Sequence, residues 1–177
     1  ALLKTGIGMS FSQNSRPASG SEHIISHLIE CVQLRDGILP NFHGEDIGVC
    51  TLEMLKYYNK LAEHKTVKTQ KENVDWDDVY KFYGSMADDV KKLNFPHNVV
   101  DDVDKDVLRE RWGDIVNIIH SVPDYNSVKE AMVKAHCKIT VDDIGKDRTL
   151  FDNCVKYSPY MRHRLTLLRL KDMIVTD

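Results

Sequence analysis

The sequence predicts an all-α protein, a bundle of seven or eight helices, and three observations support this. Apolar residues recur at spacings of three and four through most of the 177-residue chain, which is the period of an α-helix. No segment shows the strict apolar–polar alternation of a half-buried strand, and no repeat is visible. Glycine, proline and polar clusters divide the helical pattern into segments of ordinary length. The chain is long enough for one domain with a buried core.

Composition and charge are those of an ordinary globular protein. Hydrophobic residues make up 42% and charged residues 29%, and the net charge of −3 gives no reason to expect nucleic acid or a membrane surface as partner. No apolar run approaches the roughly 20 residues of a membrane span. Four cysteines lie far apart in apolar helical patterns without a CxxC pair, so we expect buried, reduced thiols and a cytoplasmic protein. They are Cys31, Cys50, Cys137 and Cys154.

The N-terminal part of the chain predicts two helices joined by a loop. Residues 1 to about 12 have helical character, and residues 14–20 form the loop. Ser19, followed three residues later by Glu22, has the form of a capping box, in which two side chains satisfy the free N–H groups at a helix start. This pattern predicts a helix from about Ser21 to Leu34.

A long helix follows after a second loop, which covers residues 35–42. Apolar residues along one side predict this helix from His43 to about His64. Residues 65–73 are polar, and we expect them to form a mobile connection.

The second half of the chain is divided by capping residues and prolines. Pro96 and Pro123 end helices, and a further helix extends to about His136. A short helical turn is predicted over residues 140–145, and Pro159 occupies the favoured first position of a last helix. Each helix start follows an aspartate or serine that can accept a hydrogen bond from the first turn. These capping residues are Asp75, Asp104, Asp147 and Ser158.

Three histidines are placed where their side chains can converge. His23 and His27 lie four residues apart, so they occupy one face of the predicted helix, together with Ser26 and Glu30 and opposite its apolar stripe. His43 begins the next helix. Because neutral imidazole is a good zinc or iron ligand, this arrangement predicts a metal and the substrate that it polarises. The other five histidines have no partner spacing and are expected at the surface.

The pattern of these histidines alone leaves a simpler alternative open. A His-x-x-x-His pair is more often solvated or helix-capping than metal-binding, and the HExxH motif is absent because Ile24 follows His23. No glycine-rich turn follows a strand, so the sequence predicts no dinucleotide-binding fold within this chain. If a nicotinamide cofactor is used, most of its site must lie elsewhere.

Three segments resemble one family of dehydrogenases. The segment Ser15–His27, SRPASGSEHIISH, closely resembles the signature of sn-glycerol-1-phosphate dehydrogenases. These belong to the superfamily of iron-containing alcohol dehydrogenases, glycerol dehydrogenases and dehydroquinate synthases. The segment Phe42–Glu45 is similar to the second histidine motif of that family, and Tyr160–Leu168 is similar to its closing helix. The three matches occur in the order of the family and span the chain.

The resemblance implies a domain organisation. Residues 1–177 would form the C-terminal α-helical metal- and substrate-binding domain of the dehydroquinate synthase-like fold. The opening residues Ala1–Lys4 are helical in character, without an initiator methionine or a cap, so we expect a fragment that lacks an N-terminal NAD(P)-binding domain. The third metal ligand of the family is an aspartate from an earlier helix, and no residue here matches it.

The resemblance also implies roles for individual residues. His23 and His43 would bind the metal, Zn2+ or alternatively Fe2+ or Ni2+, and His27 would be the catalytic residue that contacts the substrate beside it. Arg16 is a candidate contact for the substrate phosphate, although it could simply tie down its loop. The implied reaction is the reversible reduction of dihydroxyacetone phosphate to sn-glycerol 1-phosphate by NADH or NADPH, a step of phospholipid metabolism.

Two alternatives to this function remain open in the sequence. The same fold could act on glycerol or another polyol, or a helical module could keep the histidines and serve only in binding or assembly, for example as a homo-oligomer. Because two of three ligands and no cofactor fold are present, we expect the isolated chain to perform no redox chemistry.

Overall fold

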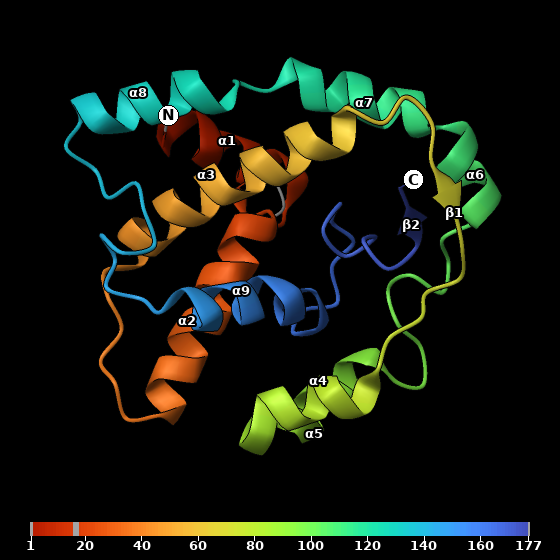
Figure 1. Cartoon of the computed structure of the whole chain (residues 1–177), viewed down its shortest axis with the longest axis horizontal. Helices are drawn as coiled ribbons and strands as arrows, with labels where there is room; N and C mark the ends of the chain where they lie inside the picture. Colours follow the sequence, from red (N-terminus) through yellow and green to blue (C-terminus); the bar gives the residue numbers. More distant parts are fainter. Residues whose placement is uncertain (1, 16–17, 177) are drawn as a thin grey trace.

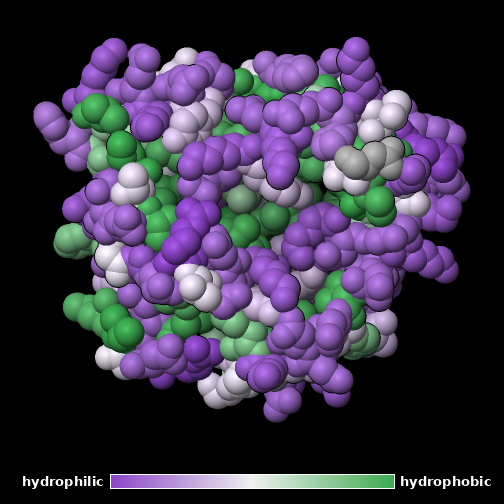
Figure 2. Space-filling view, in the orientation of Figure 1, coloured by the Kyte–Doolittle hydropathy of each residue, from purple (hydrophilic) through white to green (hydrophobic). Residues whose placement is uncertain are grey.

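The computed structural model describes residues 2–15 and 18–176, which form a mostly α-helical bundle with one small sheet (Figure 1). This confirms the predicted fold class. Figure 2 shows a mainly hydrophilic face, on which apolar residues are visible in a central recess and at the left edge. No helix in the described ranges combines the length and apolarity that a membrane crossing requires.

The described helices are mostly short, and two are long. The 3-10 turns η2 (Gly84–Met86) and η3 (Ser158–Tyr160) follow α4 and α9. The α-helices are α1 (Leu2–Ser12), α2 (Ser21–Arg35), α3 (His43–Ala62), α4 (Trp76–Tyr83), α5 (Ala87–Asn94), α6 (Lys105–Glu110), α7 (Trp112–Ser121), α8 (Tyr125–Lys134) and α9 (Arg148–Tyr157).

The predicted helix starts are confirmed at three aspartates. The side chains of Asp75, Asp104 and Asp147 accept hydrogen bonds from backbone N–H groups in the first turns of α4, α6 and α9. Two predicted helical segments are divided in the structure. Gly84 ends α4 with a φ of 57°, which glycine adopts without steric cost. Arg111, at φ −93° and ψ 10°, separates α6 from α7.

The capping box predicted before α2 is formed only in part. The N-cap residue is Gly20, not Ser19, and no side chain caps the helix from that position. The other half of the motif is present, because Glu22 Oε1 accepts a hydrogen bond of 2.8 Å from the Gly20 N–H. The carboxylate therefore satisfies a free donor at the start of α2.

The larger apolar cluster lies where α2 packs against α3 and α9. The apolar stripe of α2 is fully buried there, as its spacing predicts. Each such aliphatic side chain contributes roughly 1.5–3 kcal/mol through burial. The central buried members are Ile25, Leu28, Ile29, Val32, Val49, Cys50, Phe151 and Cys154.

Two of the predicted buried cysteines are indeed buried. Cys50 and Cys154 lie in the core, whereas Cys31 is half-buried and Cys137 is exposed. The prediction is therefore wrong for Cys137, which lies beyond the end of α8 in an exposed run, residues 133–138. All four thiols are free.

A second apolar cluster joins the end of α3 to α6, α7 and the C-terminal segment. Trp112 is its largest buried side chain, and its indole N–H donates to the His64 carbonyl at 2.7 Å. Beside this cluster, β1 (Lys68–Thr69) pairs antiparallel with β2 (Ile174–Val175). The polar connection predicted over residues 65–73 therefore contains a strand, which the sequence does not reveal because two residues are too few to show alternation.

The last predicted helix is absent, and this corrects the expectation for residues 158–168. Only η3 forms there; residues 161–166 are bends and irregular chain, and turns cover residues 167–173. Tertiary contacts replace helical ones: the Asn94 side-chain amide donates to the Tyr160 carbonyl at 2.7 Å, and the Tyr160 hydroxyl donates to Asp172 at 2.6 Å. The segment similar to the closing helix of the family is therefore part of an ordered but irregular segment, residues 158–173, which we call the C-terminal strap.

Candidate metal centre

The structure brings His23, His27 and His43 into one cluster. His23 and His27 come from the first two turns of α2, and His43 is the first residue of α3. The ring centroids of His27 and His43 lie 4.8 Å apart, those of His23 and His43 5.5 Å, and those of His23 and His27 6.4 Å. All three residues are partly exposed, so a small ligand can reach them.

The loop between α2 and α3 sets the position of His43. Gly37 has a φ of 75°, and the Ile38 N–H donates to the Gln33 carbonyl, which ends α2 and turns the chain back. Nearer to α3, the Asn41 side-chain amide donates to the Ile144 carbonyl at 2.7 Å and to Asp46 at 3.2 Å. The chain is thus anchored on both sides of His43.

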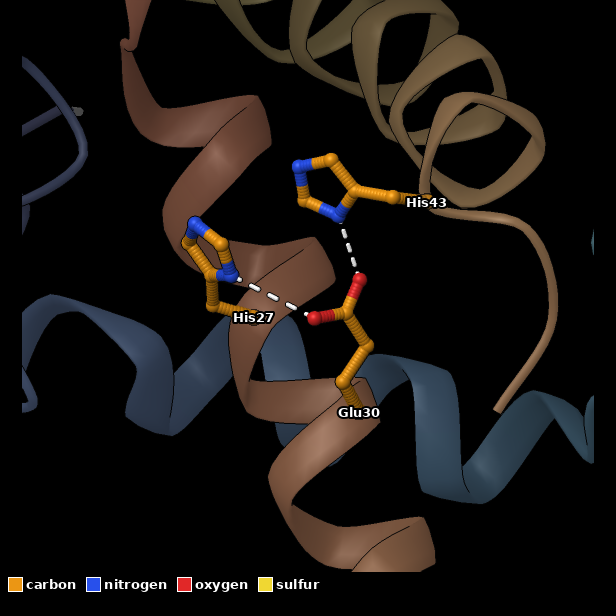
Figure 3. Close-up of side chains that lie close together, drawn as sticks. All are labelled: His27, Glu30 and His43. Atoms are coloured by element: carbon orange, nitrogen blue, oxygen red, sulfur yellow. Dashed lines mark hydrogen bonds and ion pairs between the residues drawn. The ribbon is translucent and has the colours of Figure 1, made fainter. Parts of the chain in front are cut away.

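Glu30 is a member of the cluster that the sequence analysis did not assign to the site. One carboxylate oxygen lies 3.4 Å from His27 Nδ1, and the other accepts a hydrogen bond from His43 Nδ1 (Figure 3). The fully buried Ser26 adds a hydroxyl 3.3 Å from the same His43 nitrogen. Glu30 lies three residues after His27 on the histidine face of α2, and this spacing is the signal that could have identified it.

His23 has a carboxylate partner of its own. Its Nδ1 lies 3.1 Å from Glu22 Oε1, the oxygen that also accepts the Gly20 N–H. The first turn of α2 therefore holds both a cap and a contact to a site histidine.

The donor set of the cluster fits a divalent metal ion. His27, Glu30 and His43 each offer one ligand atom, and these atoms lie within 4.8 Å of one another. Two imidazoles and a carboxylate are typical ligands of open zinc and non-haem iron sites. The structure thus places a carboxylate at the site even though the chain has no match to the aspartate ligand of the family.

Burial and hydrogen bonding act in opposite directions on the titratable groups. Burial lowers the pKa of His27, and Glu30 only partly offsets this, while His43 and Arg162 act in the same direction as burial. Burial raises the pKa of Glu30, but hydrogen bonds and charge from His43 and then His27 outweigh it and hold that pKa below its usual range. At neutral pH the cluster therefore contains an ionised carboxylate and a neutral His27.

Basic residues of the C-terminal strap lie near the cluster. Arg162 is exposed, and its positive charge is close enough to lower the pKa of His27. The Arg164 guanidinium donates to the Ser19 carbonyl and, at 3.0 Å, to the Ser15 hydroxyl, so the strap holds the loop before α2. Arg16, the predicted phosphate contact, lies outside the described residues.

Comparison with known proteins finds similarity to glycerol-1-phosphate dehydrogenases. A glycerol-1-phosphate dehydrogenase (NAD(P)+) of Methanococcus maripaludis is 44% identical over 59 residues, which are 33% of this chain and 18% of the relative. The glycerol-1-phosphate dehydrogenase (NAD(P)+) of Korarchaeum cryptofilum is 41% identical over 54 residues, which are 30% of this chain and 17% of the relative. That of Thermococcus sibiricus is 38% identical over 71 residues, 40% of this chain and 19% of the relative.

These matches are local. The chain spans less than one fifth of the length of each of these three relatives. No family model matches the chain. No solved structure matches it. The resemblance predicted from the histidine motifs is nevertheless confirmed, since part of this chain is similar to glycerol-1-phosphate dehydrogenases.

Proposed function

We propose that this chain is the metal- and substrate-binding part of an NAD(P)-dependent oxidoreductase similar to sn-glycerol-1-phosphate dehydrogenase. The convergence of three imidazoles from α2 and α3, in a chain similar to those enzymes, is the observation that supports this most directly. Residues 1–177 would be its C-terminal helical domain. The dinucleotide-binding domain would belong to a longer protein and would bind most of the NAD(P).

His23 and His43 are the proposed metal ligands, and Zn2+, Fe2+ or Ni2+ suits imidazole nitrogen. When bound, the ion would act as a Lewis acid toward the oxygen of the substrate that changes oxidation state. In the proposal, α2 and α3 supply one ligand each, so the packing between the two helices determines the shape of the site.

His27 is the proposed substrate contact and proton relay. In the direction of reduction, NAD(P)H would supply hydride for the carbonyl carbon, and His27 would deliver a proton to the carbonyl oxygen. For this step His27 would first take up a proton from solvent at the ring nitrogen that faces the substrate. Because burial lowers its pKa, the protonated ring gives that proton up readily and becomes neutral again. In the reverse direction, neutral His27 accepts the proton of the hydroxyl.

The substrate is proposed to be a small phosphorylated polyol or its ketone, dihydroxyacetone phosphate. Arg16 remains the proposed phosphate contact from the sequence. Arg162 supports the same substrate class, because it adds positive charge near His27. Guanidinium groups are well suited to phosphate because they donate two parallel hydrogen bonds.

The longer protein that contains this chain provides the test. We expect His23→Ala and His43→Ala each to remove stoichiometric metal and to abolish NADH-dependent reduction of dihydroxyacetone phosphate, with His120→Ala on α7 as a control that changes neither. Metal analysis and absorbance at 340 nm measure the two outcomes. Equal turnover of unphosphorylated dihydroxyacetone would contradict the substrate assignment, and unchanged metal content in both variants would contradict the site.

A further inference from the structure

Each of the three imidazoles meets a carboxylate at the same ring nitrogen. His23 Nδ1 faces Glu22 at 3.1 Å, and His27 Nδ1 faces Glu30 at 3.4 Å. His43 Nδ1 hydrogen-bonds the other oxygen of Glu30. Two carboxylates therefore serve three histidines, and all the contacts are made through Nδ1.

This pattern determines which nitrogen of each ring is available to a ligand. A carboxylate accepts hydrogen bonds, so a neutral imidazole that faces it carries its proton on the facing nitrogen. The other nitrogen, Nε2, then has the free lone pair. Figure 3 shows that the second nitrogen of His27 and that of His43 point away from Glu30.

The backbone before α2 is shaped to admit the first of these carboxylates. A Cβ atom on Gly20 would lie 2.6 Å from Glu22 Oε2, so a larger residue would displace the Glu22 side chain. The absence of a Cβ lets the carboxylate lie against the N-terminus of α2, where the helix dipole favours negative charge. From there the same oxygen reaches both the Gly20 N–H and His23.

The second carboxylate, that of Glu30, is also held by several contacts. Its side chain is 22% exposed, and its two oxygens are divided between His43 and His27. The buried Ser26 hydroxyl adds a contact of 3.4 Å to the oxygen that binds His43. A carboxylate fixed at both oxygens fixes the planes of the two rings that it contacts.

We propose that Glu22 and Glu30 are positioning residues that hold the three histidines in the Nδ1–H tautomer, so that Nε2 is the nitrogen each presents to metal or substrate. The inference deepens the proposed function and rests on it, because that function assigns the ligands. Carboxylates that orient ligand histidines in this way commonly change metal affinity 10- to 100-fold when they are removed.

The first experiment needs no metal. Long-range 1H–15N correlation spectra of the chain with 15N-labelled histidine distinguish the two tautomers of each ring. We expect Nδ1–H for His27 and His43, and a shift toward a mixture of tautomers in Glu30→Ala, with partial restoration in Glu30→Gln, whose amide oxygen can still accept. Dominance of the Nε2–H form in the unmodified chain would overturn the inference.

The second experiment adds Zn2+ alone, with affinity measured by competition against a chromophoric chelator. We expect Nε2 resonances to respond to zinc, and affinity to fall 10- to 100-fold in Glu30→Ala and in Glu22→Gln. Glu45→Gln removes the same charge from the first turn of α3 and should leave affinity within twofold. Thermal unfolding of each variant verifies that it is folded.

The outcomes separate this inference from the proposed function. If zinc perturbs Nδ1 rather than Nε2, Glu30 competes with or joins the ligands and the positioning role is wrong. Unchanged zinc affinity in both Glu22→Gln and Glu30→Ala would also overturn it. If instead zinc binding is indifferent to His23→Ala and His43→Ala, the proposed function fails, whereas the tautomer spectra still decide the positioning role.

Discussion

At the scale of single residues, the cluster combines an easily ionised carboxylate with an imidazole that resists protonation. The two groups are in direct contact, because Glu30 is shared between His27 and His43. For His27 the loss of hydration outweighs the attraction of the carboxylate, and for Glu30 the donors outweigh the loss of hydration. The arrangement favours a neutral histidine beside an anion at physiological pH.

The pKa shift of His27 predicts how stability depends on pH. A folded-state pKa below the unfolded value of about 6.5 means that the unfolded chain binds more protons, so this group stabilises the fold above that pH and the stabilisation is lost as the pH falls through the folded pKa. Replacing His27 with glutamine should therefore reduce the fall in unfolding free energy between pH 7 and pH 5. Urea denaturation at several pH values measures this fall in unfolding free energy for the variant and the unmodified chain.

The control for this prediction is His120→Gln, at an exposed position on α7. Its pH profile should parallel that of the unmodified chain. The assignment to His27 would be wrong if the two variants gave the same profile. Glu30 acts in the same direction at lower pH, because its pKa lies below the usual value of about 4.5 and its stabilisation is lost only as the pH falls through that folded value.

At the scale of elements, the start of α2 links helix stability to the site. Gly20→Ala would place a Cβ against the Glu22 carboxylate, whose flexible side chain would have to move away. We expect the loss of the bond between Glu22 and the Gly20 N–H to destabilise the chain by about 1 kcal/mol. We also expect zinc affinity to fall, because the displaced Glu22 carboxylate would no longer contact the His23 ring. Denaturant unfolding and zinc competition measure the two effects.

Gly44→Ala is the matched control, since it makes the same substitution in the first turn of α3. A Cβ on Gly44 would meet no heavy atom within 4 Å of the described residues, and alanine favours helix over glycine by up to about 1 kcal/mol. This variant should be neutral or stabilising. Equal destabilisation by the two substitutions would show that the effect is general to helix starts and not specific to Glu22.

At the scale of the whole molecule, a buried ion pair joins the C-terminal strap to the segment before α4. The Arg169 side chain is fully buried, and its guanidinium pairs with Glu72, with a bond of 3.1 Å to Oε2. It also lies over the Tyr160 ring at 5.0 Å. The strap also carries Arg162 and Arg164, which lie near the histidine cluster. The ion pair between Arg169 and Glu72 therefore helps to hold these two arginines in position at the site.

Removing one member of the buried pair should be costly. Arg169→Ala would leave Glu72 buried without its counterion, and we expect a loss of about 3–5 kcal/mol in unfolding free energy. The double variant Arg169→Met with Glu72→Gln should lose less, because no unpaired charge remains. Urea denaturation of the single and the double variant measures the two losses in unfolding free energy.

The surface pair between Arg111 and Asp114 is the control for this comparison. Both side chains are more than half exposed, so Arg111→Ala should cost no more than about 1 kcal/mol. A similar cost for Arg169→Ala would contradict the importance of the buried pair. If the double variant instead has the same unfolding free energy as the unmodified chain, the cost of Arg169→Ala comes from leaving the Glu72 charge unpaired, and the ion pair itself adds no net stability.

Local sequence determined the helices and the direction in which their side chains point. Periodicity and capping aspartates act within a few residues, so the starts of α4, α6 and α9 and the buried stripe of α2 follow from neighbouring positions. The common face of His23 and His27 follows in the same way. The resemblance to glycerol-1-phosphate dehydrogenases depends on a contiguous motif, and it too could be read directly.

Contacts between distant residues determined the rest. The strap after Ser158 has a sequence compatible with a helix, but hydrogen bonds to Asn94 and Asp172 and the ion pair with Glu72 hold it in turns. The sheet exists because Thr69 and Ile174, 105 residues apart in sequence, become neighbours. The spacing of Glu30 from His27 places both on one face of α2. Its contact with His43 exists only because α3 packs on α2, and no local pattern specifies that contact.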